Sequence, residues 1–284
     1  MSADGTEQQL ADFVSGLKRQ DLSDSLVRAA QRCILDYLGV GIRGACDETV
    51  RILDRWIMGD HAGGNARLLG SGMHSTRQSA AMHNGVASHV LDFDDTHIPS
   101  ILHPSSPICS ALLPAAQQIG AGGSDLLVAF VAGYEASTRI ARAIFPAHYD
   151  RGWHMTGTAG VFGAAAAVAS LHRLSPAQCV YALGLAATSS SGLRENFGSM
   201  AKSFHSGMAA RNGLMAAELA ALGYTSSTTA LSGKRGFFSV MSDESDPAVI
   251  ADGLGEEFEL LVRHSFKPYP CGVVLHPVLD AACS

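Results

Sequence analysis

Apolar residues recur along most of this chain with the spacing of an α-helix. Between residues 22 and 40 they fall on one helical face, with polar residues between them. That face carries Leu26, Ala29, Ala30, Cys33, Ile34, Tyr37 and Leu38. The pattern predicts an amphipathic helix that buries one side against the rest of the protein.

Four further segments carry helix signals. The predicted helices run from Ser124 through residue 145, over residues 158–171, from Pro176 to about Ala187, and over residues 207–222. Gly223 is a favoured C-cap for the last of them. Alanine and glycine occupy every side of the segments 158–171 and 207–222, which indicates buried helices whose axes approach closely.

Alternating β-branched runs are nearly absent, and the apolar segment 236–241 is too short to build a sheet. We therefore predict an all-α, multi-helix domain over residues 1–266. Near Lys267 the helical pattern gives way to a segment that Pro268 and Pro270 stiffen. Residues 267–284 are predicted to begin a connection, and their final helical pattern stops without a cap, as in a truncated chain.

Composition narrows the class of protein. Hydrophobic residues make up 47% of the 284 residues and charged residues 16%, enough apolar area for a large core. The net charge of −6, with no run of lysine or arginine, argues against nucleic acid and anionic membranes as partners. The sequence shows no secretory signal, no apolar run of the ~20 residues that a membrane span needs, and no zinc or iron–sulfur spacing among its six cysteines. We expect a cytoplasmic protein with reduced thiols.

Three carboxylates and two imidazoles gather in one short segment. Asp92, Asp94, Asp95, His97 and His103 are residue types that bind metals or exchange protons. Adjacent carboxylates repel each other, so packing alone gives little reason to place them together. The structural alternative is a helix end followed by an Asx-turn loop.

Three later segments place a cation or an imidazole among small or rigid residues. His154 precedes a Thr- and Gly-rich helix start that can receive an anion, or it is a buried residue of an ordinary N-cap loop. Lys202 and His205 lie just before an apolar helix, where a lysine either neutralises a carboxylate or enolate or is simply solvated. Lys267 is held in place by prolines, or its segment is a plain connector.

The remaining candidates are weaker. No Walker, GxSxG or HExxH sequence is present, and nothing near Cys271 clearly activates it as a nucleophile. The other histidines are interpreted as surface or core residues: His61, His74, His83, His89, His148 and His172. The four polar segments therefore carry the candidate chemistry.

The order of these segments resembles the MmgE/PrpD family. LDFDDTH and HPSS come first, then GWHMTGTAG, then GSMAKSFHSGMAARNG, and finally FKPYPC, and the resemblance extends from about Leu10 to the end. It implies a homodimer of two-domain subunits, each with a large all-α domain and a smaller α+β lid domain, which is missing or only begun here. It also implies a small polycarboxylate substrate and chemistry without metal or organic cofactor. Family members include 2-methylcitrate dehydratase, cis-aconitate decarboxylase and iminodisuccinate epimerase.

The resemblance also implies the residues of the active site. The positions carried over by motif are Asp92, Thr96, His103, His154, Lys202 and Lys267. We assign catalysis to His103, His154, Lys202 and Asp92, and substrate binding to Thr96, Lys267 and His205. The lysines would hold carboxylates and an enolate-like charge, while the imidazoles would transfer the proton next to a carboxylate.

Two positions depart from the family forms. Decarboxylase members carry a histidine soon after the lysine of the last segment, where this chain has Gly272. His97 stands after Thr96, where dehydratases and decarboxylases have a tryptophan-bearing form. We therefore expect a dehydratase-type lyase of a di- or tricarboxylate such as 2-methylcitrate, with an epimerase or a cis-aconitate-type decarboxylase as alternatives.

Two hypotheses from other classes stay open. A metal-dependent hydrolase would gather the carboxylates and histidines of residues 92–103 around one ion. A non-catalytic helical interaction protein would leave the four polar segments far apart, whereas an enzyme would bring them to one pocket.

Overall fold

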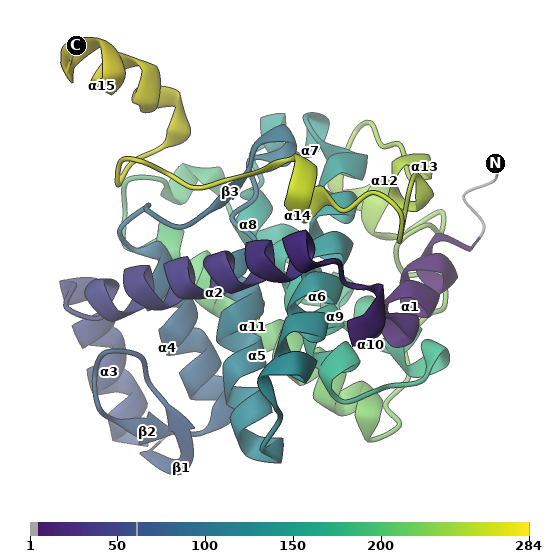
Figure 1. The fold of residues 1–284 in the computed structure, drawn as a ribbon, viewed down its shortest axis with the longest axis horizontal. Coiled ribbons are helices and arrows are strands. Elements are labelled where there is room, and N and C mark those ends of the chain that lie inside the picture. Colours follow the sequence, from purple (N-terminus) through teal and green to yellow (C-terminus); the bar gives the residue numbers. More distant parts are fainter. Residues whose placement is uncertain (1–4, 61, 284) are drawn as a thin grey trace.

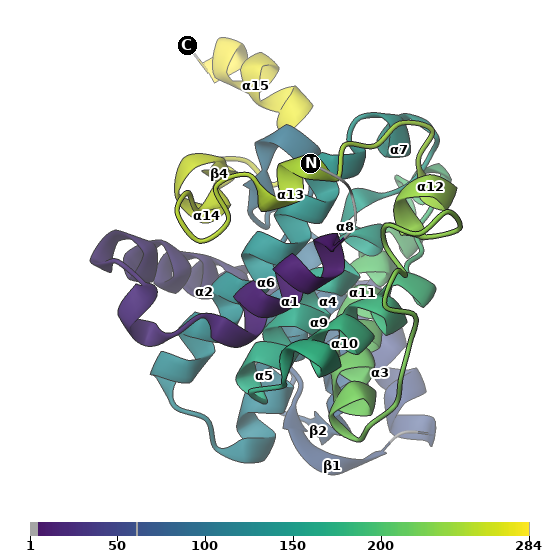
Figure 2. The same ribbon diagram turned by 90° about the vertical axis from the view of Figure 1, so that its right-hand side faces the viewer.

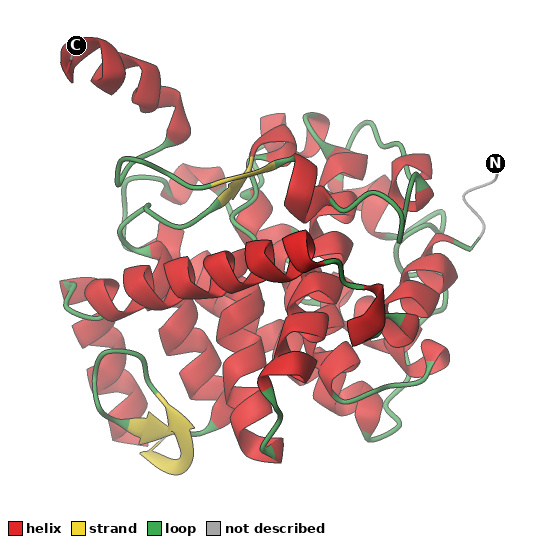
Figure 3. Cartoon of the chain, viewed as in Figure 1, coloured by secondary structure: helices red, strands yellow, loops and turns green. Residues whose placement is uncertain are grey.

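The computed structural model describes residues 5–60 and 62–283, and most of them are helical (Figure 3). The longer helices are α1 (Thr6–Gly16), α2 (Asp24–Gly44), α3 (Glu48–Asp60), α4 (Arg77–His89), α5 (Ser105–Ile119), α6 (Gly123–Ile144), α9 (Gly160–Leu171), α10 (Pro176–Thr188) and α11 (Ala201–Ala221). The shorter ones are α7 (Ala147–Asp150), α8 (Met155–Thr158), α12 (Phe237–Met241), α13 (Ala248–Ala251), α14 (Glu259–Val262) and α15 (His276–Cys283). The predicted all-helical domain is confirmed.

The predicted helices form close to the expected places. Ser23 caps α2 by accepting a hydrogen bond from the backbone N–H of Leu26, and Ser175 caps α10 in the same way. One boundary is wrong: the helix predicted over residues 207–222 begins at Ala201. Lys202 and His205 are therefore on α11 itself and not in a loop before it, because helix-compatible residues continue the helix toward its N-terminus. The segment 236–241 forms the short helix α12.

The Ala- and Gly-rich α9 lies inside the bundle (Figure 2). It contacts α5, α6, α10 and α11, and all of its residues except Ser170 are buried. The long α2 crosses one face of the bundle in Figure 1, with α4 and α5 behind it. Over residues 5–60 and 62–283, no helix combines the length and the apolar character that a membrane span requires.

Two small antiparallel sheets interrupt the helical fold. One is a hairpin of β1 (Ala62–Arg67) and β2 (His74–Ser75) at the end of α3. The other pairs β3 (Thr96–His97) with β4 (His264–Ser265), with Thr96 opposite Ser265. This second pairing matters for function because it brings the chain around Lys267 beside the polar segment that follows α4.

The chain after β4 leaves the bundle. It passes through a 3₁₀ turn, Val273–Leu275, and α15 then projects away from the other helices (Figure 1). None of the residues described in α15 is buried. The boundary between residues 266 and 267 remains a prediction. The remaining 3₁₀ turns are Arg19–Asp21, Ile98–Ser100 and Arg194–Asn196.

Glycines set the distance between α4 and α11. A Cβ atom on Gly207 would lie 2.6 Å from the carbonyl oxygen of Met82, and one on Gly85 would lie 2.7 Å from the Cα of Gly207. Real Cβ atoms do not approach so closely, so the two backbones touch only because both positions lack side chains. The crossing fixes α11, with Lys202 and His205, against the C-terminal half of α4.

Gly207→Ala is expected to lower the free energy of unfolding by about 1–3 kcal/mol, because the added methyl group pushes the two helices apart. Gly39→Ala is the matched control, since Gly39 is an exposed glycine within α2 with open space around it. That change is expected to raise the free energy of unfolding by about 0.5–1 kcal/mol through helix propensity. Urea denaturation followed by circular dichroism measures both, and equal stabilities for the two variants would contradict the close crossing.

Candidate active site

The four polar segments come together at one end of α4, where His89 is the last residue of the helix. The loop after it carries Asp92, Asp94 and Asp95, and β3 adds Thr96. Three buried serine hydroxyls hold the surrounding helices in place: Ser106 Oγ of α5 lies 2.7 Å from Ser88 Oγ of α4 and 2.6 Å from Ser206 Oγ of α11. The helices that present the candidate residues are thus joined by hydrogen bonds as well as by packing.

Asp92 joins two lysines from distant parts of the chain. Its Oδ1 lies 2.6 Å from the Nζ of Lys267 and 3.0 Å from the Nζ of Lys202. Lys267 Nζ also donates to the backbone carbonyl of Asp92 at 2.9 Å. Asp92 has a φ of 50°, in the left-handed region that few side chains adopt, and this lets its carbonyl and carboxylate both meet one ammonium group. Burial alone would raise the pKa of Asp92, but the two ammonium groups hold it below its ordinary value.

Four imidazole rings form a contiguous array beside this ion cluster. His89 lies between His103 and His154, with ring centroids 5.1 Å and 5.6 Å away. His154 Nδ1 lies 3.0 Å from His205 Nδ1, so one of these nitrogens donates to the other. The buried carboxylate of Asp94 lies 2.7 Å from His89 Nδ1. Burial opposes ionisation of Asp94, but His89 and His103 outweigh it and hold the Asp94 pKa well below its usual range.

His103 is held by neutral groups. Its Nδ1 lies 2.8 Å from the backbone carbonyl of Asp95, to which it donates, and 3.2 Å from Thr96 Oγ1. Asp95 itself accepts from the backbone N–H and the hydroxyl of Ser105 at the start of α5. Burial raises the pKa of Asp95 to about 8, so this carboxyl acts as a helix cap and not as a charged member of the site.

Burial keeps three of the four imidazoles uncharged. It lowers the pKa of His103 to about 3, and it lowers those of His154 and His205 as well. A neutral imidazole accepts a hydrogen bond or a proton, and an anionic ligand in contact with it favours the protonated form. The array is therefore suited to proton exchange with a substrate that carries several negative charges.

The pKa of His103 also predicts acid sensitivity. Between pH 6.5 and 3, unfolded His103 binds a proton that the folded protein excludes, so the free energy of unfolding falls as the pH falls through that window. His103→Asn keeps a donor for the Asp95 carbonyl and removes this titration. The loss of stability from pH 7 to pH 5 is expected to be about 2 kcal/mol smaller in the variant than in the wild type. Urea titrations at both pH values test it. The exposed His74→Asn should match the wild type, and an unchanged loss in His103→Asn would refute the prediction.

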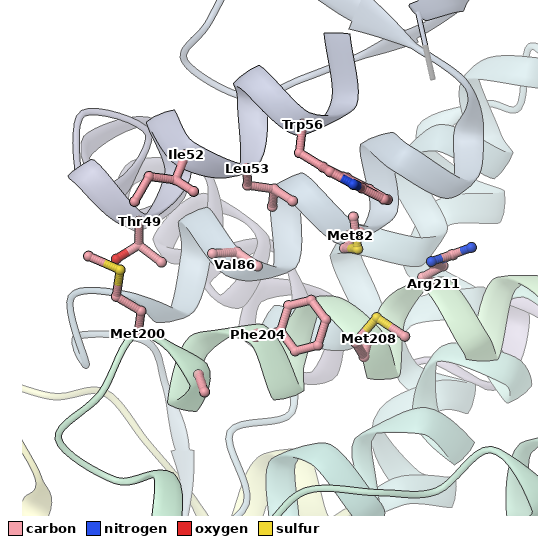
Figure 4. Close-up of a pocket in the computed structure, with 11 residues that line it drawn as sticks. Thr49, Ile52, Leu53, Trp56, Met82, Val86, Met200, Phe204, Met208 and Arg211 are labelled. Atoms are coloured by element: carbon pink, nitrogen blue, oxygen red, sulfur yellow. The ribbon is translucent and has the colours of Figure 1, made fainter. Parts of the chain in front are cut away.

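Two neighbouring hollows differ in character. A cavity of about 480 Å³ is lined by His89, Asp92, Lys202 and Phe197, among others. A second, of about 620 Å³, lies between α3, α4 and α11 and is mostly apolar (Figure 4). Its labelled side chains include Leu53, Trp56, Met82, Phe204 and Met208. The cavity with the lysine, carboxylate and imidazole is the candidate active site, because it combines groups that can bind and transfer charge, whereas the charged side chain in the lining of the second cavity is Arg211.

The structure brings all seven predicted site residues into one cluster: Asp92, Thr96, His103, His154, Lys202, His205 and Lys267. Their convergence favours the enzyme over the non-catalytic interaction protein. The interpretation of His89 as an ordinary surface or core residue missed its place between His103 and His154. No motif marks it, since it is a single histidine at the end of a helix of small residues. His61 lies outside the described residues.

His97 points away from this cluster. Its ring bonds to Ser100 Oγ at 2.7 Å and to Glu259 Oε2 at 3.0 Å, and Glu259 also pairs with Arg142 and Arg263. The unusual histidine after Thr96 therefore ties β3 to the segment that precedes β4. It does not shape the candidate active site.

The acidic segment does not form one coordination site. Asp92 meets two lysines, Asp94 meets His89, Asp95 caps α5, and His97 meets Glu259. Among the described residues the only grouping of metal-type donors is Cys33, Asp95 and His264. There Cys33 Sγ lies 3.6 Å from Nε2 of His264, whereas Asp95 Oδ2 lies 3.4 Å from Nδ1, on the other side of the ring. Of the carboxylates and histidines of residues 92–103 that the metal-dependent hydrolase would gather around one ion, this grouping contains only Asp95.

Comparison with known proteins shows to which protein family this chain is related. Residues 8–250 match the MmgE/PrpD N-terminal domain. This chain belongs to the MmgE/PrpD family. The match extends over most of the helical bundle and includes every candidate site residue except Lys267.

Curated relatives of this MmgE/PrpD chain carry the name cis-aconitate decarboxylase. The protein of Mus musculus is 32% identical over 297 residues, which cover 98% of this chain and 58% of the relative. The protein of Homo sapiens is 30% identical, and that of Aspergillus terreus is 29% identical, each with 98% of this chain and 59% of the relative covered. The chain thus spans less than two thirds of the length of these relatives. They favour the decarboxylase alternative over the dehydratase that we expected.

Proposed function

We propose that this chain carries the helical domain of a carboxy-lyase that acts on a small unsaturated tricarboxylate such as cis-aconitate. The observation that supports it best is an ion cluster of Asp92, Lys202 and Lys267 beside an array of four imidazoles. Asp92, Lys202 and one of these imidazoles, His89, line the same cavity. The names of the relatives, cis-aconitate decarboxylase, support this reaction type. The proposal replaces the expected dehydration by loss of CO₂ and keeps the expected substrate class.

Substrate binding is assigned to Lys202, and Lys267 supports it from behind. The side chain of Lys202 is 21% exposed and lines the cavity, so its ammonium group can meet a substrate carboxylate. The side chain of Lys267 is 1% exposed and stays against Asp92, where it fixes the carboxylate that orients Lys202. Thr96 holds His103 in position through its hydroxyl. A charge-assisted contact of this kind contributes roughly 1.5–3 kcal/mol.

Decarboxylation requires the site to stabilise a negative charge and to supply a proton. When the carbon–carbon bond to the departing carboxylate breaks, CO₂ leaves and the electron pair stays on the substrate as an enolate-like anion. Lys202 stabilises that charge more strongly than the charge of the substrate, which is the condition for catalysis. An imidazole then supplies the proton that forms the new C–H bond, and His103 and His154 are the two that the family motifs indicate. Each such group typically contributes about 10²–10⁴-fold.

A dehydratase remains the second candidate because of Gly272. A Cβ atom at this position would lie 3.9 Å from Oδ2 of Asp92, so the residue borders the ion cluster. Decarboxylase members carry a histidine at the matching place, and this chain offers no side chain there. This departure from the family form therefore lies at the candidate active site, whereas the departure at His97 lies away from it.

A substrate panel tests the proposal. The protein is incubated with cis-aconitate, 2-methylcitrate, citrate and iminodisuccinate, while CO₂ release and the absorbance of new double bonds are followed. The proposal predicts CO₂ from cis-aconitate, and double-bond formation from 2-methylcitrate without CO₂ would favour the dehydratase. Binding of tricarballylate, a saturated tricarboxylate, is measured by calorimetry in parallel. The absence of both CO₂ release and tricarballylate binding would contradict the proposal. The homodimer is proposed on the resemblance alone and is tested by sedimentation.

A further inference from the structure

One imidazole of the array, His89, has a carboxylate at hydrogen-bond distance, whereas His103 Nδ1 is 4.0 Å from the same carboxylate, that of Asp94. His89 Nδ1 lies 2.7 Å from a buried carboxylate oxygen of Asp94. By contrast, His103 Nδ1 bonds to a backbone carbonyl, and His154 Nδ1 faces another imidazole. A carboxylate favours the proton on the facing nitrogen and stabilises the imidazolium, as the third member of a catalytic triad does.

The other nitrogen of His89 is buried and unpaired. Among the described residues, Nε2 has no hydrogen-bond partner, although the side chain has 0% exposure. Leaving a buried polar atom without a partner destabilises a fold, so such an atom in a native protein calls for a functional reason. His89 also lines the cavity that holds Asp92 and Lys202. The residue that carries the unpaired nitrogen thus borders the space where a substrate of this site would lie.

We propose that His89, oriented by Asp94, is the proton donor of this site, in place of His103 and His154. This inference rests on the proposed decarboxylation. In its step the carbon–carbon bond to the departing carboxylate breaks, and the electron pair stays on the substrate as CO₂ leaves. Imidazolium His89 gives its Nε2 proton to the resulting carbanion, a C–H bond forms, and the ring becomes neutral while its Nδ1 proton remains toward Asp94. Water then returns one proton to Nε2, so each turnover consumes one proton and releases one CO₂.

The decisive variant is His89→Asn, because an asparagine amide can replace Nδ1 toward Asp94 but has nothing in the place of Nε2. With cis-aconitate, kcat is expected to fall at least 100-fold while KM stays within about threefold. Asp94→Asn is expected to give a smaller fall in kcat. His83→Asn is the matched control: His83 is a buried histidine on the same helix with its own carboxylate, Asp54, at 2.8 Å, and it does not line the cavity. Its kcat is expected within twofold of the wild-type value.

If His89 had a purely structural role, His89→Asn would have a lower melting temperature, but kcat would not fall selectively while KM stayed constant. A kcat of His89→Asn within threefold of the wild type overturns the donor role and leaves the proposed function standing. A wild type that releases no CO₂ removes the proposed function, and the donor role with it. Nitrogen-15 NMR of labelled histidines tests the orientation independently of turnover: a proton on Nδ1 of His89 at pH 7 supports it, and a lone Nε2 proton overturns it.

Discussion

Lys202→Ala is expected to reduce CO₂ release from cis-aconitate by about 10²–10³-fold, because the variant lacks the cation that faces the cavity when enolate-like charge develops. The affinity for tricarballylate should fall by roughly 10- to 100-fold, the equivalent of one charge-assisted contact. The fold should persist, since Asp92 keeps its contact of 2.6 Å with Lys267 after Lys202 is shortened. Circular dichroism and thermal melting measure that persistence.

Lys234→Ala is the control for this variant, since Lys234 is exposed and far along the chain from the four polar segments. It should bind tricarballylate and turn over cis-aconitate as the wild type does. Full activity in Lys202→Ala would show that another group holds the reacting carboxylate, and the assignment of the cavity would then have to be abandoned.

Arg139→Ala is expected to have the largest effect on stability, about 3–5 kcal/mol. Arg139 is 1% exposed within α6, and its guanidinium bonds to Glu135 at 3.1 Å. It also donates to the backbone carbonyl oxygens of Ile250, Asp252, Gly253 and Glu257. The variant leaves a buried carboxyl and several carbonyl groups without their hydrogen-bond donor. In the folded protein these groups are then removed from water with no hydrogen bond in exchange.

The consequence extends to the candidate active site, since the loop over residues 250–257 leads into α14 and β4 and then to Lys267. Urea denaturation should therefore show a lower midpoint, and tricarballylate binding should weaken together with it. Arg173→Ala is the control, because that side chain is 82% exposed and its contact with Asp125 spans 3.4 Å. A surface pair of this kind contributes at most about 1 kcal/mol. Equal losses in the two variants would contradict the bracing role of Arg139.

Helix periodicity predicted the bundle well because long helices repeat one signal many times. The start of α11 was misplaced by several residues, since Ala201 to Ser206 has no apolar face that separates a first helical turn from a loop. The small sheets were not predicted either. A pairing of two residues with two residues, such as β3 with β4, is too short to show an alternation.

The site residues were predicted one by one, but their partners were not. The contact of Lys267 with Asp92 joins positions 175 residues apart and depends on that short strand pairing. His89 was missed because its function depends on what surrounds it. His89 bonds to Asp94 and lies between two other imidazole rings, whereas His74 is exposed. The sequence alone does not distinguish the two histidines.

The left-handed backbone of Asp92 limits which residues this position can accept. Only glycine, asparagine and aspartate adopt a φ of 50° without much strain, yet the two lysines beside this position require an anion. Glycine and asparagine can adopt this backbone conformation but carry no negative charge. Glutamate carries the charge but is strained in this conformation. In a library of all twenty amino acids at this codon, selection for activity should therefore return aspartate almost alone, whereas selection for folding should also return asparagine and glycine.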